Sequence, residues 1–82
     1  MIGLNINEAV SKRIIELCKT RNLSINGLAT ACMLTQSTVA HIISGASSNP
    51  KLLTIFRICS GLNITPAEFF NSDLFNDIDI EL

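Results

Sequence analysis

The chain has 82 residues, enough for one domain with a single modest hydrophobic core. Apolar residues make up 48% of it, while Trp and Tyr are absent and Phe occurs four times, a balance that fits a helical domain built on Ile, Leu, Val and Ala. No apolar run approaches the roughly 20 residues of a membrane helix. The basic residues near the N-terminus follow the apolar ones, the wrong order for a secretory signal. We therefore expect a cytoplasmic protein with no membrane contact.

The formal net charge of −1 lacks the overall basic excess of many nucleic-acid-binding proteins. The charges are unevenly distributed, however. Residues 1–70 hold six basic residues against three acidic ones, whereas residues 71–82 hold four acidic residues and no basic one. The sequence therefore predicts a mildly basic body, net +3, and an acidic tail, net −4.

The first predicted element is a helix over residues 7–21, which Asn5 or Asn7 can cap. Its apolar stripe at helical spacing is Val10, Ile14 and Leu17.

Two short helices are predicted next, over residues 25–32 and 36–43, joined by a turn at residues 33–34. Ser24 and Thr35 are suitable N-caps for them. The residues expected to face inward are Leu28, Ala29, Cys32, Val39, Ile42 and Ile43. The residues of the second helix expected to face outward are Gln36, Ser37, Ala40, His41 and Ser44.

A polar loop over residues 46–49 leads to a fourth helix, predicted to begin at Asn49-Pro50 with proline at its first position. The apolar residues that make it the expected central helix are Leu52, Ile55, Phe56, Cys59 and Leu62. Thr65-Pro66-Ala67-Glu68 is a capping box that opens a short fifth helix ending near Phe70.

The two ends of the chain show a different pattern. Residues 2–6 and 78–82 alternate apolar and polar side chains, with the period of two that is typical of strands. A small β-ribbon, formed within one chain or across a dimer, and frayed termini both fit this pattern. The expected division is an N-terminal extension (1–6), a helical domain (7–71) and an acidic tail (72–82).

The three cysteines, Cys18, Cys32 and Cys59, are widely spaced and form no CxxC motif, and the chain has a single histidine. This pattern disfavours a disulfide framework or a zinc site. Because all three fall on apolar helix faces, we expect buried, reduced thiols that pack as small hydrophobic side chains. No metal or cofactor is expected.

Two short helices joined by a tight turn, the second with small polar side chains outward, form the arrangement that places a helix in the DNA major groove. Residues 13–70 resemble the xenobiotic-response-element family of helix-turn-helix proteins, which includes phage repressors and Cro-like proteins. The matching features, in order, are Leu-Ala at 28–29, Thr-Gln-Ser-Thr-Val at 35–39, Ser-Gly at 44–45, Asn-Pro at 49–50 and the Leu-x-Ile-Thr-Pro-x-Glu-Phe-Phe ending at 62–70. The resemblance implies an all-α, five-helix domain that binds duplex DNA and regulates transcription as a repressor.

The resemblance also assigns roles along the helix over residues 36–43. Gln36 occupies the position from which such proteins commonly reach base edges, and a glutamine amide can pair with the N6/N7 edge of adenine. Ser37 and His41 share its exposed face, and the Ala40 methyl group suits a thymine methyl. Each of these four also fits a plain surface residue.

Phosphate contacts are expected on either side of this helix, where donors matter more than charge. The first group lies at helix starts: Ser24, Ile25, Thr35 and Thr38. The second group follows the helix: Ser47, Ser48, Asn49 and Lys51. Since Lys51 is the one cation in this set, we expect modest affinity per monomer and a homodimer that supplies the rest.

The sequence departs from the family pattern in two places. Met33 stands in the turn where relatives often have glycine. Cys18 and Ile43 stand where many relatives carry a paired Arg and acidic residue, an exchange that concerns stability rather than base readout.

Other function classes fit less well. No cluster of catalytic residues points to an enzyme. A protein-interaction module of the same fold, such as an antitoxin or regulatory adaptor, is the alternative, and the acidic tail would then contact a protein partner.

Overall fold

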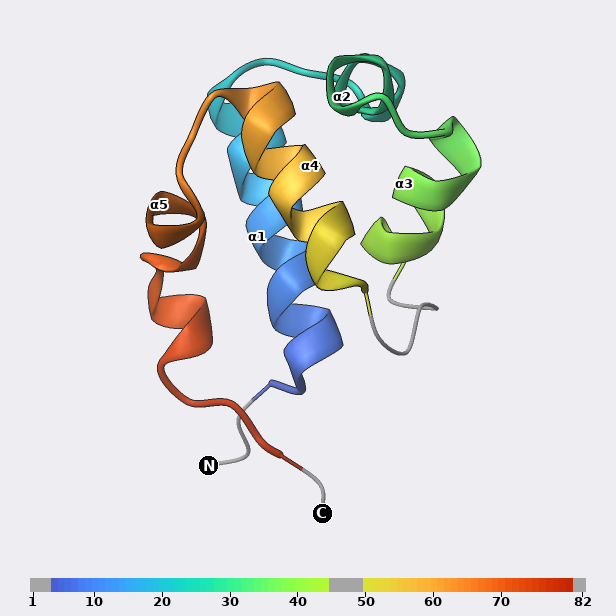
Figure 1. Cartoon of the computed structure of the whole chain (residues 1–82). Coiled ribbons are helices and arrows are strands. Elements are labelled where there is room, and N and C mark those ends of the chain that lie inside the picture. Colours follow the sequence, from blue (N-terminus) through green and yellow to red (C-terminus); the bar gives the residue numbers. More distant parts are fainter. Residues whose placement is uncertain (1–3, 45–49, 81–82) are drawn as a thin grey trace.

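The computed structural model describes residues 4–44 and 50–80, which form five α-helices and one short 3-10 helix (Figure 1). The helices are α1 (Ile6–Thr20), α2 (Ile25–Cys32), α3 (Gln36–Ile43), α4 (Leu52–Leu62), α5 (Pro66–Phe70) and the 3-10 helix η1 (Asp73–Phe75). The predicted all-α, five-helix fold is confirmed. Within the described residues, no helix has the length and apolar character needed to cross a bilayer.

The starts of α1, α2, α3 and α5 are set by local side-chain caps. Asn5 accepts a hydrogen bond from the Glu8 amide and begins α1 one residue earlier than predicted. Ser24 and Thr35 cap α2 and α3, as expected. Thr65 and Glu68 form the predicted capping box of α5. These caps satisfy amide groups that a helix start otherwise leaves without partners.

Helix α4 differs from the prediction at its start. Lys51 has an extended backbone, with ψ at 145°, so that helical geometry begins at Leu52 and Pro50 precedes the helix. Not all of its apolar residues face the core, because Leu52 and Phe56 are 67% and 49% exposed while Ile58 is fully buried. The face turned to the core is set by the spacing of Ile55, Ile58, Cys59 and Leu62, which places Phe56 on the outer side.

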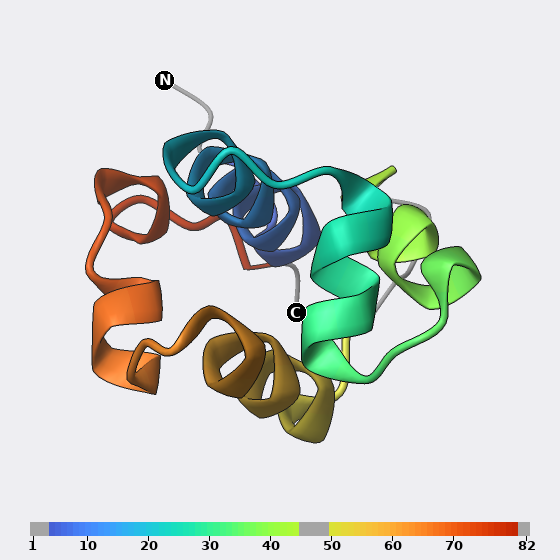
Figure 2. The same ribbon diagram turned by 90° about the horizontal axis from the view of Figure 1, so that it is seen from above.

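Viewed from above, the helices surround one core (Figure 2). Helices α1 and α4 lie on opposite sides, α2 closes one end between them, and α5 and η1 close the other. Helix α3 packs on α1 and α2 at the edge of the molecule. All five helices contribute to the largest fully buried side chains, which are Ile14, Leu28, Val39, Ile58, Cys59 and Phe69.

The cysteines Cys18, Cys32 and Cys59 are buried and unpaired, as expected. Burial raises the pKa of the Cys18 and Cys59 thiols. Burial, together with the neighbouring Cys18 and Cys59, raises the pKa of Cys32 to about 11. The three thiols are therefore neutral near pH 7.

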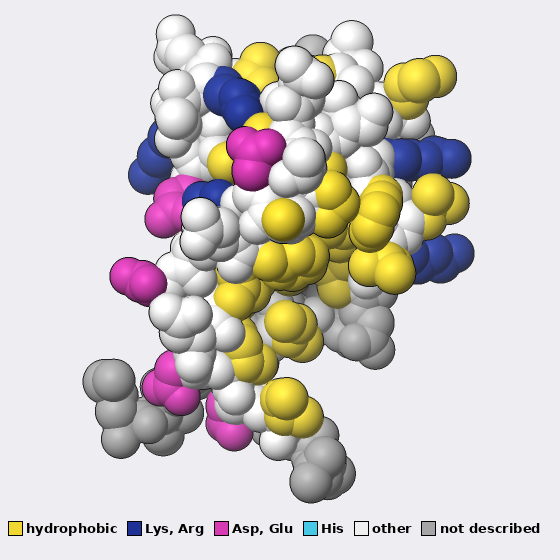
Figure 3. All heavy atoms as spheres, turned by 60° about the vertical axis from the view of Figure 1, so that its left-hand side comes forward, with side chains coloured by type: hydrophobic (Ala, Val, Ile, Leu, Met, Phe, Trp, Pro, Cys, Tyr) yellow, Lys and Arg dark blue, Asp and Glu magenta, His cyan; other side chains and the backbone are white. Residues whose placement is uncertain are grey.

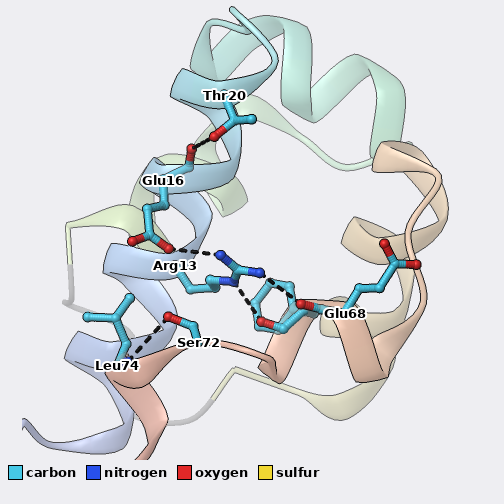
Figure 4. A network of polar contacts seen from close by, with 7 residues as sticks. Arg13, Glu16, Thr20, Glu68, Ser72 and Leu74 are labelled. Carbon is cyan, nitrogen blue, oxygen red and sulfur yellow. Dashed lines mark hydrogen bonds and ion pairs between the residues drawn. The ribbon is translucent and has the colours of Figure 1, made fainter.

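The short helix α5 is held to α1 by Arg13 (Figure 4). Its guanidinium donates to the carbonyl oxygens of Phe69 at 2.7 Å and Glu68 at 2.8 Å, and pairs with the Glu16 carboxylate at 2.9 Å. Carbonyls at a helix C-terminus carry partial negative charge, so a cation there is favourable. Arg13 therefore fastens an element too short to be stable alone.

The segment after α5 also packs on the body. The Phe75 ring lies 4.9 Å from the Phe70 ring and 6.1 Å from the Phe69 ring, measured between centroids. A single parallel bridge joins Leu4 to Ile78 in the same chain, with the Asp79 amide donating to the Leu4 carbonyl at 2.9 Å. In the described part of the chain, the two ends are thus paired by one bridge within the protomer, and they form no extended β-ribbon.

Candidate nucleic-acid interface

The turn between α2 and α3 fixes the angle at which α3 leaves the body (Figure 1). Met33 adopts the left-handed conformation, with φ at 57° and ψ at 40°, and ends α2. The Leu34 amide then donates to the Ala29 carbonyl at 2.9 Å, which closes the turn. The left-handed geometry that relatives often obtain with glycine is therefore present here with methionine.

The inner side of α3 is anchored. Val39 and Ile42 are buried, and Ile43 is partly buried against the core. The Ser11 hydroxyl of α1 donates to the Ile43 carbonyl, which ties the C-terminal end of α3 to α1. Cys18 is buried as well, consistent with apolar packing where relatives carry an ion pair.

The outer side of α3 carries the predicted base-contacting residues. Gln36, Ser37, Ala40 and His41 are all exposed and lie within one and a half turns of the same helix. Within the described residues, the side-chain amide of Gln36 has no hydrogen-bond partner. A rigid helix therefore presents a glutamine amide, a hydroxyl, a methyl group and an imidazole to solvent.

Two helix starts offer free backbone donors. At α2, Ser24 satisfies the amides of Gly27 and Leu28, which leaves the Ile25 and Asn26 amides without an acceptor in the described part of the protein. At α3, Thr35 satisfies the amides of Thr38 and Val39 in the same way. Free amides at a helix N-terminus suit an anion.

The hydroxyls of Thr35 and Thr38 lie 2.7 Å apart and share one hydrogen bond. Each hydroxyl has one hydrogen, so one of the two remains able to donate outward. The pair therefore supplies one outward donor rather than the two that the sequence suggested.

A hollow of about 420 Å³ lies beside the exposed face of α3. The described residues that line it are Ser37, Thr38, His41 and Ile42 of α3 and Pro50, Lys51 and Thr54. The hollow brings His41 and Lys51 to the same site, and no carboxylate is among these lining residues. The predicted contacts Ser47, Ser48 and Asn49 lie outside the described residues.

Thr54 was not singled out from the sequence. It lies one helical turn after Lys51 and adds a hydroxyl to the hollow. Its spacing from Lys51 was the available signal, but that spacing becomes informative only once α3 is known to face the start of α4.

The fold and this exposed helix define a helix-turn-helix DNA-binding domain. Residues 14–69 match the HTH_3 family, described as helix-turn-helix, and the chain belongs to this family of xenobiotic-response-element and Cro-like DNA-binding regulators. No curated protein matches the chain.

Solved structures of similar proteins support the same assignment. The prophage Lp1 protein 11 is 36% identical with a TM-score of 0.79, covering 92% of this chain and 99% of its own. The restriction-modification controller protein C.AhdI from Aeromonas hydrophila is 30% identical with a TM-score of 0.72, covering 78% of this chain and 96% of its own. An HTH_3 family transcriptional regulator from Vibrio cholerae is 28% identical, with a TM-score of 0.76. The match covers 83% of this chain, but it spans only 38% of the length of that regulator.

Proposed function

We propose that the protein is a sequence-specific transcriptional regulator, acting as a repressor, that inserts α3 into the major groove of duplex DNA. The observation that carries the proposal is the exposed face of α3, where Gln36 stands without a protein partner at the helix start. In this family, α3 is the helix expected to enter the groove. A regulator of this kind works where the DNA is, in the cytoplasm.

Base readout is assigned to the outer face of α3. Gln36 pairs with an adenine edge, Ser37 donates to a groove acceptor, and Ala40 contacts a thymine methyl. His41 lies at the border of this face, where it meets the hollow. The discrimination contributed by one good bidentate base contact is about 1–3 kcal/mol.

Phosphate binding is assigned to the surroundings of α3. The Ile25 amide and Ser24 hydroxyl act at the start of α2, and the Thr35–Thr38 pair acts at the start of α3. On the other side, Lys51 is proposed to contact the backbone together with Ser47, Ser48 and Asn49. These contacts fix the orientation of α3 but carry no sequence information.

We also propose that the regulator is a homodimer, because apolar side chains gather on one face of the protein (Figure 3). A groove of about 180 Å³ is lined there by the exposed apolar residues Ile6, Leu52 and Phe70, and α4 has two further exposed apolar residues, Leu53 and Phe56. Clustered exposed apolar residues mark interaction sites. A two-fold dimer would place its two α3 helices in half-sites about one helical turn, roughly 34 Å, apart.

The second candidate is an antitoxin or regulatory adaptor of the same fold. It is favoured by the acidic residues that follow α5, among which Asp73, Asp77 and Asp79 are exposed and are available to a basic protein partner. Selection of duplexes from a random library separates the two candidates.

The expected result of that selection is enrichment of a defined duplex sequence by the wild-type protein. Gln36→Ala should weaken binding to the selected duplex about tenfold and relax selection at one base position, with an unchanged circular dichroism spectrum. Met33→Ala, which alters an exposed side chain outside the reading face, serves as the control. Failure of the wild-type protein to enrich any sequence would favour the adaptor.

A further inference from the structure

We propose that His41, in its protonated form, binds a DNA backbone phosphate together with Lys51, so that DNA binding strengthens as the pH falls. This inference rests on the proposed function and adds a regulation of the same site. The site is the hollow beside α3, which is lined by side chains of α3 and of the start of α4.

The hollow is suited to a phosphate by its donors. His41 and Thr38 come from α3, while Lys51 and Thr54 come from the start of α4. Lys51 and Thr54 supply an ammonium group and a hydroxyl to the lining, and His41 in its protonated form would add an imidazolium. A phosphodiester between them would accept hydrogen bonds from both sides.

The described lining of the hollow contains no carboxylate that could pair with a protonated His41, so the anion would have to come from the DNA. Lys51 is the one charged residue among the described lining residues. Helix α2, which packs on α3, carries a single titratable side chain, the buried Cys32. Helix α1 also packs on α3, but its charged residues Glu8, Lys12, Arg13, Glu16 and Lys19 do not line the hollow.

Without DNA, the described lining of the hollow gives neither Lys51 nor His41 an anion to pair with. With a phosphate between the two, each cation faces an anion instead, and protonation of His41 becomes favourable. The binding of DNA and the binding of a proton to His41 are therefore coupled, and each strengthens the other.

The pH range of the effect follows from the composition. His41 is the single histidine of the chain, and an unperturbed imidazole has a pKa of about 6.5. The cysteine thiols have raised pKa values and remain neutral below pH 8. Because an imidazole ordinarily gains its proton in this range and a phosphate favours the protonated form, we expect the affinity per subunit to increase about sixfold between pH 8 and pH 6.

The experiment measures fluorescence anisotropy of a labelled 24-base-pair duplex of mixed sequence with the full chain, at pH 6 and pH 8 and several salt concentrations. Because the proposed dimer brings two His41 side chains to the duplex, the wild-type protein should bind about 36-fold more tightly at pH 6, about sixfold per subunit. Its salt dependence should be steeper there by about 1.8 in slope, as expected for two additional phosphate contacts. His41→Gln, which keeps a hydrogen-bonding side chain but does not titrate, should bind as the wild type does at pH 8 and gain nothing at pH 6.

Two controls identify the contact. Lys51→Ala should weaken binding at both pH values but keep an increase at pH 6. A·T-rich and G·C-rich duplexes should show the same ratio of affinities, because a phosphate is common to both, whereas a base contact from His41 would make the ratio depend on sequence.

The outcomes distinguish this inference from the function on which it rests. Binding that does not change with pH, or that changes equally in His41→Gln, would overturn the role of His41 and leave DNA binding intact. No binding to any duplex at either pH would overturn both. A ratio that differs between the two duplexes would assign His41 to a base edge instead.

Discussion

Met33 has a backbone conformation that is costly for its side chain. Three described residues other than glycine have positive φ, namely Asn22, Met33 and Asn63. Asparagine tolerates this region, because its short polar side chain can bond locally, but a methionine side chain gains nothing from it. The Met33 side chain is 87% exposed, so little packing compensates for the strain.

Met33→Gly should therefore stabilise the protein. The left-handed conformation costs an ordinary residue about 1–2 kcal/mol, and glycine removes this strain. Glycine also loses more conformational entropy on folding, so the net increase in the free energy of unfolding should be about 0.5–1 kcal/mol. Urea unfolding measures the difference. Met33→Ala retains the strain and should give no gain, and equal stabilisation by both variants would contradict a backbone origin.

At the scale of the elements, helices α2 and α4 approach each other closely at Gly61. A Cβ atom added there would lie 2.6 Å from the Cys32 Sγ and 2.7 Å from the Ala31 carbonyl oxygen. Both distances are shorter than van der Waals contact, and one of them involves backbone. Glycine at this position therefore serves the packing of two helices, since it allows α2 to lie directly on α4.

Gly61→Ala should destabilise the protein by about 1–2 kcal/mol, because the helices must separate and this outweighs the better helix propensity of alanine. Gly27→Ala is the matched control in α2, where the added Cβ would meet its nearest atom, the Ser24 Oγ, at 3.3 Å. Urea unfolding of both variants tests the packing. A loss from Gly61→Ala no larger than that from Gly27→Ala would show that the close approach is not limiting.

At the scale of the whole molecule, the apolar surface around Leu52 and the exposed face of α3 are separate features of one chain. A regulator that contacts DNA with few charges benefits from binding through two subunits at once. The apolar surface should then set the oligomeric state, and the oligomeric state should set the affinity for DNA.

Leu52→Glu should convert the proposed dimer to a monomer, because a carboxylate in an apolar interface loses its hydration without gaining a partner. Leu52 is the first residue of α4, where an acidic side chain is compatible with the helix. Analytical ultracentrifugation measures the mass of the variant. Met33→Glu, which also places a charge at an exposed apolar residue but outside the groove, should remain dimeric, and a wild-type monomer at all concentrations would exclude the dimer.

The sequence predicted the parts of the fold that depend on near neighbours. Ser24, Thr35 and the Thr65–Glu68 box marked helix starts correctly, because a cap connects residues three positions apart. The outward direction of Gln36 and His41 followed from helical spacing in the same way.

Other features depended on segments far apart in the chain. Arg13 contacts carbonyls 55 and 56 residues away, and nothing in its own surroundings indicates that role. Phe56 was counted among the apolar residues of the central helix and lies half exposed, because the apolar composition of α4 exceeds what the core can cover.

The sequence by itself determined a five-helix helix-turn-helix domain, since its caps, helical periods and family motifs are local properties of the chain. The tertiary structure decided which apolar residues of α4 are left exposed and which donors gather beside α3. It placed Lys51 and Thr54 opposite His41 because burial of Val39, Ile42 and Ile55 fixes the two helices against the core. That juxtaposition depends on long-range packing, which no local pattern encodes.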